Sequence, residues 1–202
     1  MALYSSETGL DSHRVRFVIA EKGINVDVIN VSRDDSAAAD LAELNPYNRA
    51  PTLVDRDLVL YNASVINDYL DERYPHPPLM PVDPVSRAQL RLVHHRILQD
   101  WYSLAYEIEA GAGKIVEQAA RQLKEGLIAA NELFKIQDYL LSDELTLVDC
   151  MLGPLMWRLS HYGVKLGKPG ASVETYAQRV FSRASFKSSL TMAERELVLG
   201  IS

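Results

Sequence analysis

The sequence has little of what disulfide-bonded, membrane and nucleic-acid-binding proteins contain. Its 202 residues include one cysteine, Cys150, which excludes an internal disulfide framework and makes a reducing cytoplasm the expected location. No apolar run approaches the roughly 20 residues that span a bilayer, and no signal-peptide pattern opens the chain, so we expect no membrane contact. The formal net charge of −6 argues against direct nucleic-acid binding as the main mode, because neutralising phosphates requires a basic face.

Motifs for cofactors and metals are also missing. The chain has no glycine-rich phosphate loop. His94 and His95 are adjacent on a predicted helix, so they diverge and lack the i, i+4 spacing of a zinc pair. Cys150 falls in a predicted buried helix, where a cysteine serves as a small apolar filler. We therefore expect no metal and no cofactor.

What is present in the first half is a pattern of alternating strands and helices. Short β-branched or apolar stretches are followed by amphipathic stretches, and the polar turn Asp55-Arg56-Asp57 separates two of the short ones. The expected order is βαβαββα, with strands near 2–5, 26–31, 53–54 and 58–61, and helices near 12–22, 36–44 and 63–73. The first two strands should be parallel and the hairpin antiparallel. Residues 1–74 are therefore predicted to form a compact α/β domain.

A proline-rich segment follows at residues 75–84. Between Tyr74 and Pro84, five of eleven residues are proline, which removes backbone donors and stops both helix and strand. The result is a stiff, extended segment that loses little entropy when a partner grips it. Two interpretations fit: a rigid connector, or a preformed partner-binding segment.

From residue 85 to residue 202 the pattern is helical throughout. Apolar residues recur every three or four positions from Leu90 to Ile108, and a second long helix is expected to carry apolar residues from Val116 to Phe134. Thr146 and Asp149 have the spacing of an N-terminal capping box for a buried helix. Shorter helices are expected at 173–181 and 193–199. The fold class is thus an α/β domain followed by an all-α domain.

Three motifs resemble the glutathione transferase superfamily over nearly the whole length: Asn45-Pro46, the stretch Ala50-Pro51-Thr52-Leu53, and the box at 146–149. The resemblance implies a thioredoxin-like domain followed by a helical bundle, and usually a dimer. It also implies a cis peptide bond before Pro51.

Longer blocks, above all Asp71-Glu72-Arg73-Tyr74-Pro75-His76-Pro77-Pro78, resemble the stringent starvation protein A family within that superfamily. Its members bind the sigma-bearing RNA polymerase holoenzyme and regulate transcription in stationary phase and stress. The resemblance implies a non-catalytic regulator that is a homodimer, or a heterodimer with a paralogue. The expected partner-binding residues are Pro75, His76, Pro77, Pro78, Leu79, Met80, Pro81 and Asp83. Exposed Leu79 and Met80 would supply apolar contact area, and Asp83 replaces an aromatic residue that members often carry.

The glutathione cleft of the superfamily would correspond to Tyr4, Gly9, Ala50, Pro51, Asn62 and Ala63. Thiol-type members carry cysteine at the position aligned with Gly9, and the acidic-Ser pair that binds the γ-glutamyl carboxylate is replaced by Asn62-Ala63. Losing one hydrogen bond to a charged group costs about 1.5–3 kcal/mol. We therefore interpret the cleft as vestigial. The alternative is a glutathione-dependent transferase that uses Tyr4 or a nearby serine (Ser5, Ser6 or Ser12).

Overall fold

The computed structural model describes residues 1–32 and 35–199, which form two compact units. The first unit contains residues 1–78 together with the C-terminal segment from Ala184, and the second contains Leu79–Arg183. The division expected from the sequence (1–74, 75–84, 85–202) differs in two respects: it treats residues 75–84 as a separate link, whereas the units divide between Pro78 and Leu79, and it places the C-terminal segment with the helices. Residues 200–202 of that predicted domain lie outside the described residues.

The first unit is built on a four-stranded sheet with the order β2-β1-β3-β4. Its strands are β1 (Ala2–Ser5), β2 (Asp27–Asn30), β3 (Thr52–Asp55) and β4 (Leu58–Tyr61). β1 pairs with β2 in parallel and with β3 in antiparallel fashion, and β3 and β4 form an antiparallel hairpin. The predicted βαβαββα order and strand directions are confirmed.

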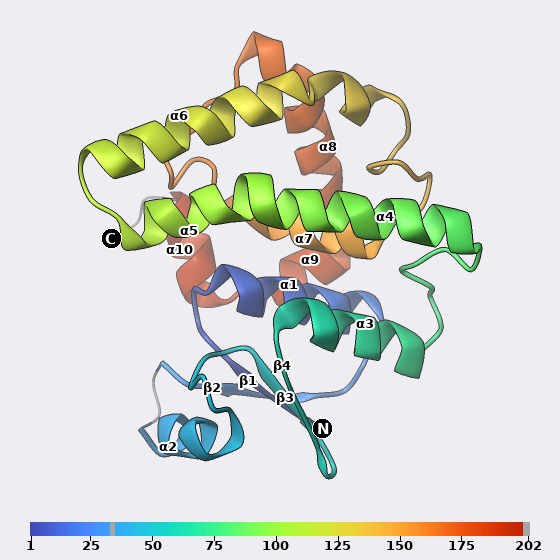
Figure 1. The fold of residues 1–202 in the computed structure, drawn as a ribbon, viewed down its shortest axis with the longest axis vertical. Coiled ribbons are helices and arrows are strands. Elements are labelled where there is room, and N and C mark those ends of the chain that lie inside the picture. Colours follow the sequence, from blue (N-terminus) through green and yellow to red (C-terminus); the bar gives the residue numbers. More distant parts are fainter. Residues whose placement is uncertain (33–34, 200–202) are drawn as a thin grey trace. The chain divides into compact units, whose positions relative to one another are not determined.

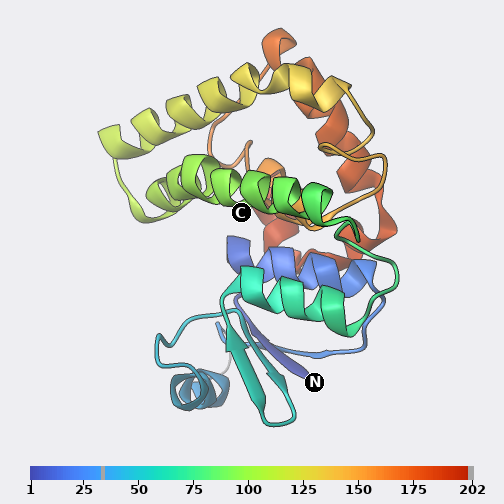
Figure 2. The same ribbon diagram turned by 45° about the vertical axis from the view of Figure 1, so that its right-hand side comes forward.

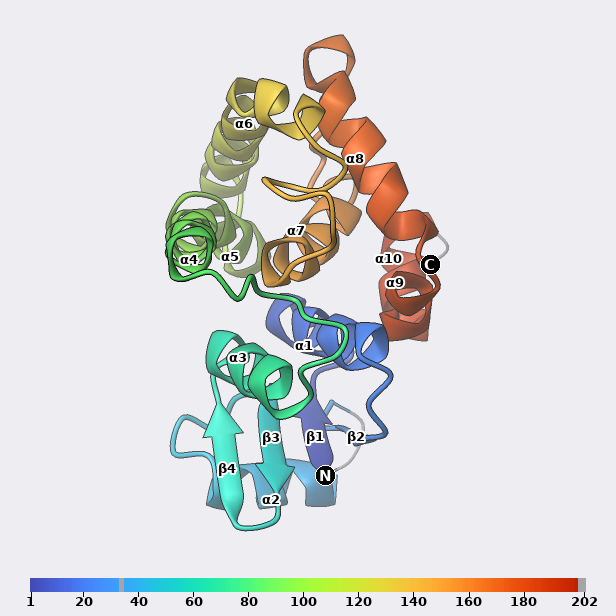
Figure 3. The same cartoon turned by 90° about the vertical axis from the view of Figure 1, so that its right-hand side faces the viewer.

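Helices cover both faces of this sheet (Figure 3). α1 (Leu10–Glu21) and α3 (Ala63–Arg73) lie on one face, and α2 (Asp35–Leu44) lies on the other. Two C-terminal helices, α9 (Ala184–Ser189) and α10 (Met192–Leu199), belong to the same unit. The fully buried ring of Phe186 in α9 packs edge-on against Phe17 of α1. The peptide bond before Pro51 is cis, as the resemblance implied.

Every long element described in the second unit is helical (Figures 1 and 2). It begins with three consecutive helical segments, α4 (Pro84–Ile97), the π-helical η1 (Leu98–Tyr102) and α5 (Ser103–Ala110). The others are α6 (Lys114–Ala129), the 3-10 turn η2 (Asn131–Lys135), α7 (Leu147–Trp157), the 3-10 turn η3 (Lys168–Gly170) and α8 (Ala171–Ser182). The predicted second long helix ends at Ala129, so Phe134 lies in η2 and not in that helix.

α7 is the buried helix of this unit, and its N-terminus has the predicted capping box. The Asp149 carboxylate accepts hydrogen bonds from the Thr146 amide at 2.8 Å and from the Tyr176 hydroxyl at 2.5 Å. Complete burial nevertheless raises the pKa of Asp149, although these bonds oppose the shift. Cys150 follows and is fully buried, as expected of an apolar filler.

Among the described residues, no helix combines the length and the apolar character that crossing a membrane requires. Residues 1–32 and 35–199 also contain no group of three or more His, Cys, Asp or Glu side chains placed to hold a metal ion.

Candidate functional site

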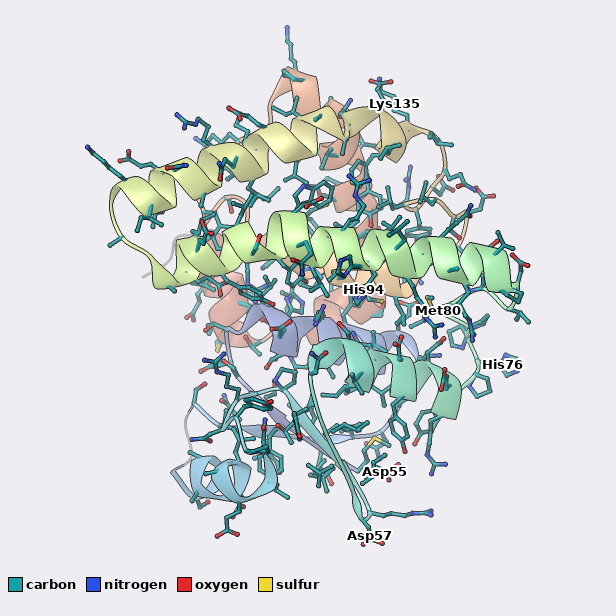
Figure 4. The ribbon with its side chains drawn as sticks, in the orientation of Figure 1. Asp55, Asp57, His76, Met80, His94 and Lys135 are labelled. Carbon is teal, nitrogen blue, oxygen red and sulfur yellow. The ribbon has the colours of Figure 1, made fainter. Side chains whose placement is uncertain are left out.

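The proline-rich segment divides into an exposed part and a buried part. Residues 75–78 are all exposed, and Figure 4 shows His76 projecting away from the ribbon beside α3. Leu79 and Met80 are only 2% and 8% exposed. The prediction that these two side chains supply exposed apolar area is therefore wrong. Proline fixes the backbone geometry, but the burial of a neighbouring side chain depends on apolar surface supplied from elsewhere in the chain.

The buried part is also fixed through its backbone. The carbonyl of Leu79 accepts a hydrogen bond from the amide of Leu147, the first residue of α7, at 2.9 Å. That amide belongs to the first turn of a helix, where backbone donors have no partner within the helix. Leu79 therefore anchors the start of the second unit.

Asp83 has a local structural role. Its carboxylate accepts from the amide of Ser86 at 2.7 Å and caps α4, which begins at Pro84. This hydrogen bond lowers the pKa of Asp83. Two apolar side chains flank it in the open: Val82 is 89% exposed and Val85 is 66% exposed. The exposure of these two valines could not be predicted from the sequence, because nothing local distinguishes an exposed valine from a buried one.

Lys22, at the C-terminal end of α1, holds the start of the proline-rich segment. Its fully buried ammonium donates to the carbonyl of Tyr74 at 2.7 Å and to that of Pro77 at 2.8 Å. It also lies 2.7 Å from a carboxylate oxygen of Asp71 in α3. These contacts could not be predicted from the sequence, because Lys22 lies 52 and 55 positions from the residues whose carbonyls it binds.

The six residues of the expected ligand cleft come together at one end of the sheet. The register places Tyr4 opposite Thr52, and Thr52 opposite Tyr61. The end of β1, the Ala50-Pro51 bond before β3 and the start of α3 at Asn62-Ala63 therefore share this end. α1 also begins here, with Gly9 as its N-cap residue.

Serine side chains fill the space beside Gly9. The hydroxyl of Ser6 accepts from the amide of Gly9 at 3.2 Å, and that of Ser12 accepts from the amide of Ser6 at 3.0 Å. A Cβ atom at position 9 would lie only 3.0 Å from the Cβ of Ser6. A reactive side chain at this position would require Ser6 to shift.

The N-terminus of α3 is already capped. The side-chain oxygen of Asn62 accepts from the amides of Ser64 at 2.9 Å and Val65 at 3.4 Å. An incoming carboxylate would compete with Asn62 for these donors. The buried Ala63 has no polar side-chain group, and the Ser64 hydroxyl accepts from Arg14 at 3.2 Å.

Tyr4 faces away from α1. Its ring packs with Ala37 and Leu41 of α2, whereas the next residue, Ser5, accepts a hydrogen bond from Arg16 of α1. This is the alternation of a β-strand, so Tyr4 and Ser5 lie on opposite faces of the sheet. Burial, and secondly the charge of Asp40, raise the pKa of Tyr4. Its hydroxyl is thus on the face opposite to the helix that carries Gly9.

The comparisons with known proteins all indicate the same family. Residues 3–78 match the glutathione S-transferase N-terminal domain, and residues 93–184 match the glutathione S-transferase C-terminal domain. The chain is 46% identical to a stringent starvation protein A homolog from Haemophilus ducreyi, over 94% of this chain and 89% of the relative. It is 47% identical to one from Coxiella burnetii, over 98% and 94% respectively.

Solved structures agree on the fold. A glutathione S-transferase from Methylobacillus flagellatus with bound glutathione superposes with a TM-score of 0.82. It is 23% identical and covers 95% of this chain and 99% of its own.

Proposed function

This chain belongs to the stringent starvation protein A family, a branch of the glutathione S-transferase superfamily, and from that premise we propose that it is a non-catalytic, cytoplasmic transcription regulator that binds the sigma-bearing RNA polymerase holoenzyme. The exposed segment Pro75-His76-Pro77-Pro78 is the proposed contact. The single observation that carries the proposal is the exposure of this stiff segment in a chain so similar to those relatives.

The segment has the properties of a preformed recognition element. Three of its four residues are prolines, so little backbone freedom is lost on binding. The imidazole of His76 can donate and accept hydrogen bonds and gives the contact direction. Leu79 and Met80 are buried, so they do not supply the apolar part of the contact; in the second unit Val82 and Val85 are exposed, and we propose them as a separate apolar contact.

Three features of the cleft count against a glutathione transferase. Gly9 offers no side chain and has Ser6 packed beside it. The amides of Ser64 and Val65, in the first turn of α3, are bound by Asn62. Tyr4 packs against α2, and its raised pKa disfavours the phenolate form. The glutathione-dependent transferase is the alternative, and calorimetry with glutathione tests it.

The direct test is a pull-down of purified holoenzyme. Replacing Pro75, His76 and Pro77 together by alanine should abolish co-purification while the thermal unfolding midpoint stays near that of the unchanged chain, because these side chains are exposed. The matched control replaces Val28, an exposed residue on β2, by alanine. Normal binding by the triple variant would refute the proposed contact.

We also propose that the protein self-associates. A surface pocket of about 120 Å³ in the second unit is lined by apolar residues including Val93, Ile97 and Trp101. Leu92, which precedes Val93 on α4, is 60% exposed, and we take it together with this pocket as the proposed interface. Mass measurement of the isolated chain tests this: Leu92→Asp should shift a dimer to a monomer. A single-chain mass for the unchanged protein would refute self-association and leave pairing with a paralogue as the remaining option.

A further inference from the structure

The shape of the exposed proline segment depends on one side chain outside it. Among residues 75–78, only His76 has a backbone N–H, because the other three are prolines. The segment therefore has almost no donors with which to close a turn on its own carbonyls. Its carbonyls need donors from elsewhere or from water.

Lys22 supplies these donors. A lysine ammonium has three N–H groups, and here three acceptors lie at 2.7–2.8 Å: the carbonyls of Tyr74 and Pro77 and the carboxylate of Asp71. Its side chain is fully buried, so the ammonium is shielded from water, and the two bonds to the carbonyls are partly buried. The two carbonyls are three residues apart and are held to the same nitrogen, with His76 between them.

We propose that Lys22 is the positioning residue of the polymerase-binding segment: by binding the carbonyls of Tyr74 and Pro77 to one ammonium, it fixes the conformation in which His76 is presented. This inference rests on the proposed function. Asp71 binds the ammonium, and the other two bonds of Lys22 go to the carbonyls of Tyr74 and Pro77. Two features therefore restrict the conformation of the segment: its prolines fix backbone angles, and Lys22 links the carbonyls of Tyr74 and Pro77.

The structure allows a charge-neutral test. Lys22→Met with Asp71→Asn removes one positive and one negative charge, leaves the formal net charge at −6 and leaves no unpaired buried charge. Asp71→Asn alone is the matched control for the lost carboxylate: an amide oxygen still accepts from Lys22 and both carbonyl bonds remain, so the uncompensated ammonium lowers the free energy of unfolding but not the affinity of the folded protein. If the freed segment adopts the binding conformation one-tenth of the time, affinity falls about tenfold.

The expected result is a holoenzyme affinity within about twofold of the unchanged chain for the control, and a loss of about tenfold or more for the double variant. The NMR signals of the His76 imidazole should move toward those of a free peptide with the sequence of residues 74–78. The amide signals of the β-sheet should stay in place, which separates positioning from a general loss of structure. If the double variant does not fold, Lys22→Met with Asp71→Leu replaces the buried pair by apolar groups, and the same comparison is made.

Two results would overturn the inference, and they differ. Equal affinity of the control and the double variant would show that Lys22 does not position the segment, while the proposed function would stand. No binding by the unchanged chain would refute the proposed function, and this inference with it.

Discussion

The guanidinium of Arg16 lies 2.7 Å from the carboxylate of Glu194, and these two residues are 178 positions apart. Glu194 is fully buried in α10, and the imidazole of His13 lies 3.5 Å from the same carboxylate oxygen. Arg16 also donates to the hydroxyl of Ser5 and to the carbonyl of Ser189. A single buried network therefore joins β1, α1 and the two C-terminal helices of the first unit.

Replacing Glu194 by glutamine should strongly destabilise the protein. The change leaves the guanidinium of Arg16 buried without its counter-charge, a situation that costs about 3–5 kcal/mol. Urea unfolding measures this as a lower transition midpoint. Glu196→Gln, on the exposed side of the same helix, is the matched control and should leave the midpoint almost unchanged. Equal midpoints for both variants would contradict a structural role for the network.

Substitutions of Leu79 and Val82 should distinguish a residue that stabilises the fold from one that contacts the partner. Leu79→Ala removes a buried side chain and should lower the free energy of unfolding by about 2–5 kcal/mol. Val82→Ala alters a side chain that is 89% exposed, so stability should change by about 0.5 kcal/mol or less. Holoenzyme binding by folded protein should instead weaken for the Val82 variant. The prediction fails if Leu79→Ala unfolds at the same denaturant concentration as the unchanged chain.

Because Asn62 caps the start of α3, restoring the acidic-Ser pair at positions 62 and 63 should increase the affinity for glutathione. Asn62→Glu with Ala63→Ser removes the amide that caps Ser64 and Val65 and adds a hydroxyl donor. One hydrogen bond to a charged group corresponds to roughly a ten- to hundredfold change in affinity. Calorimetry should detect glutathione binding to the double variant more readily than to Asn62→Glu alone. Tight binding to the unchanged chain, lost in Tyr4→Phe, would argue instead for the transferase.

The hydroxyl of Tyr69 donates to the carboxylate of Asp55 at 2.6 Å and lowers the pKa of Asp55, with Arg73 adding a smaller effect in the same direction. Since the folded pKa is below the ordinary value, ionised Asp55 stabilises the fold above about pH 3.9, and this stability is lost as the pH falls through the lowered pKa. Tyr69→Phe should raise the pKa of Asp55 toward its ordinary value. An NMR titration of the Asp55 carboxyl measures this change.

Tyr61→Phe is the control for that titration, because Tyr61 contacts the ring of Tyr47 on another part of the sheet. It should leave the pKa of Asp55 unchanged. An identical titration curve for Tyr69→Phe and the unchanged chain would show that the hydrogen bond does not set this pKa.

The elements that were predictable from the sequence have local signals. The Thr146–Asp149 capping box spans four residues, and the hairpin turn consists of two, Arg56 and Asp57. Their residue types determine backbone hydrogen bonding within a few positions, so they can be recognised without knowing the rest of the fold.

The features that were not predictable depend on partners far along the chain. The burial of Leu79 and the carbonyl bonds of Lys22 follow from tertiary packing, which no spacing rule encodes. The same holds for α9, a helix of six residues that was not predicted and whose Phe186 packs on Phe17. Phe134 fits the helical spacing of α6, but the helix ends five residues earlier.

The return of the C-terminal helices to the first unit has a consequence for biosynthesis. Residues 1–78 leave the ribosome first, but Phe186 and Glu194 emerge only after the 105 residues from 79 to 183 have been made. At elongation rates of about 5–20 residues per second, that delay is on the order of 5–20 s. During this time Phe17 lacks the packing of Phe186, and Arg16 lacks the carboxylate of Glu194. The nascent chain is then open to chaperones and proteases, and its oldest part is completed last.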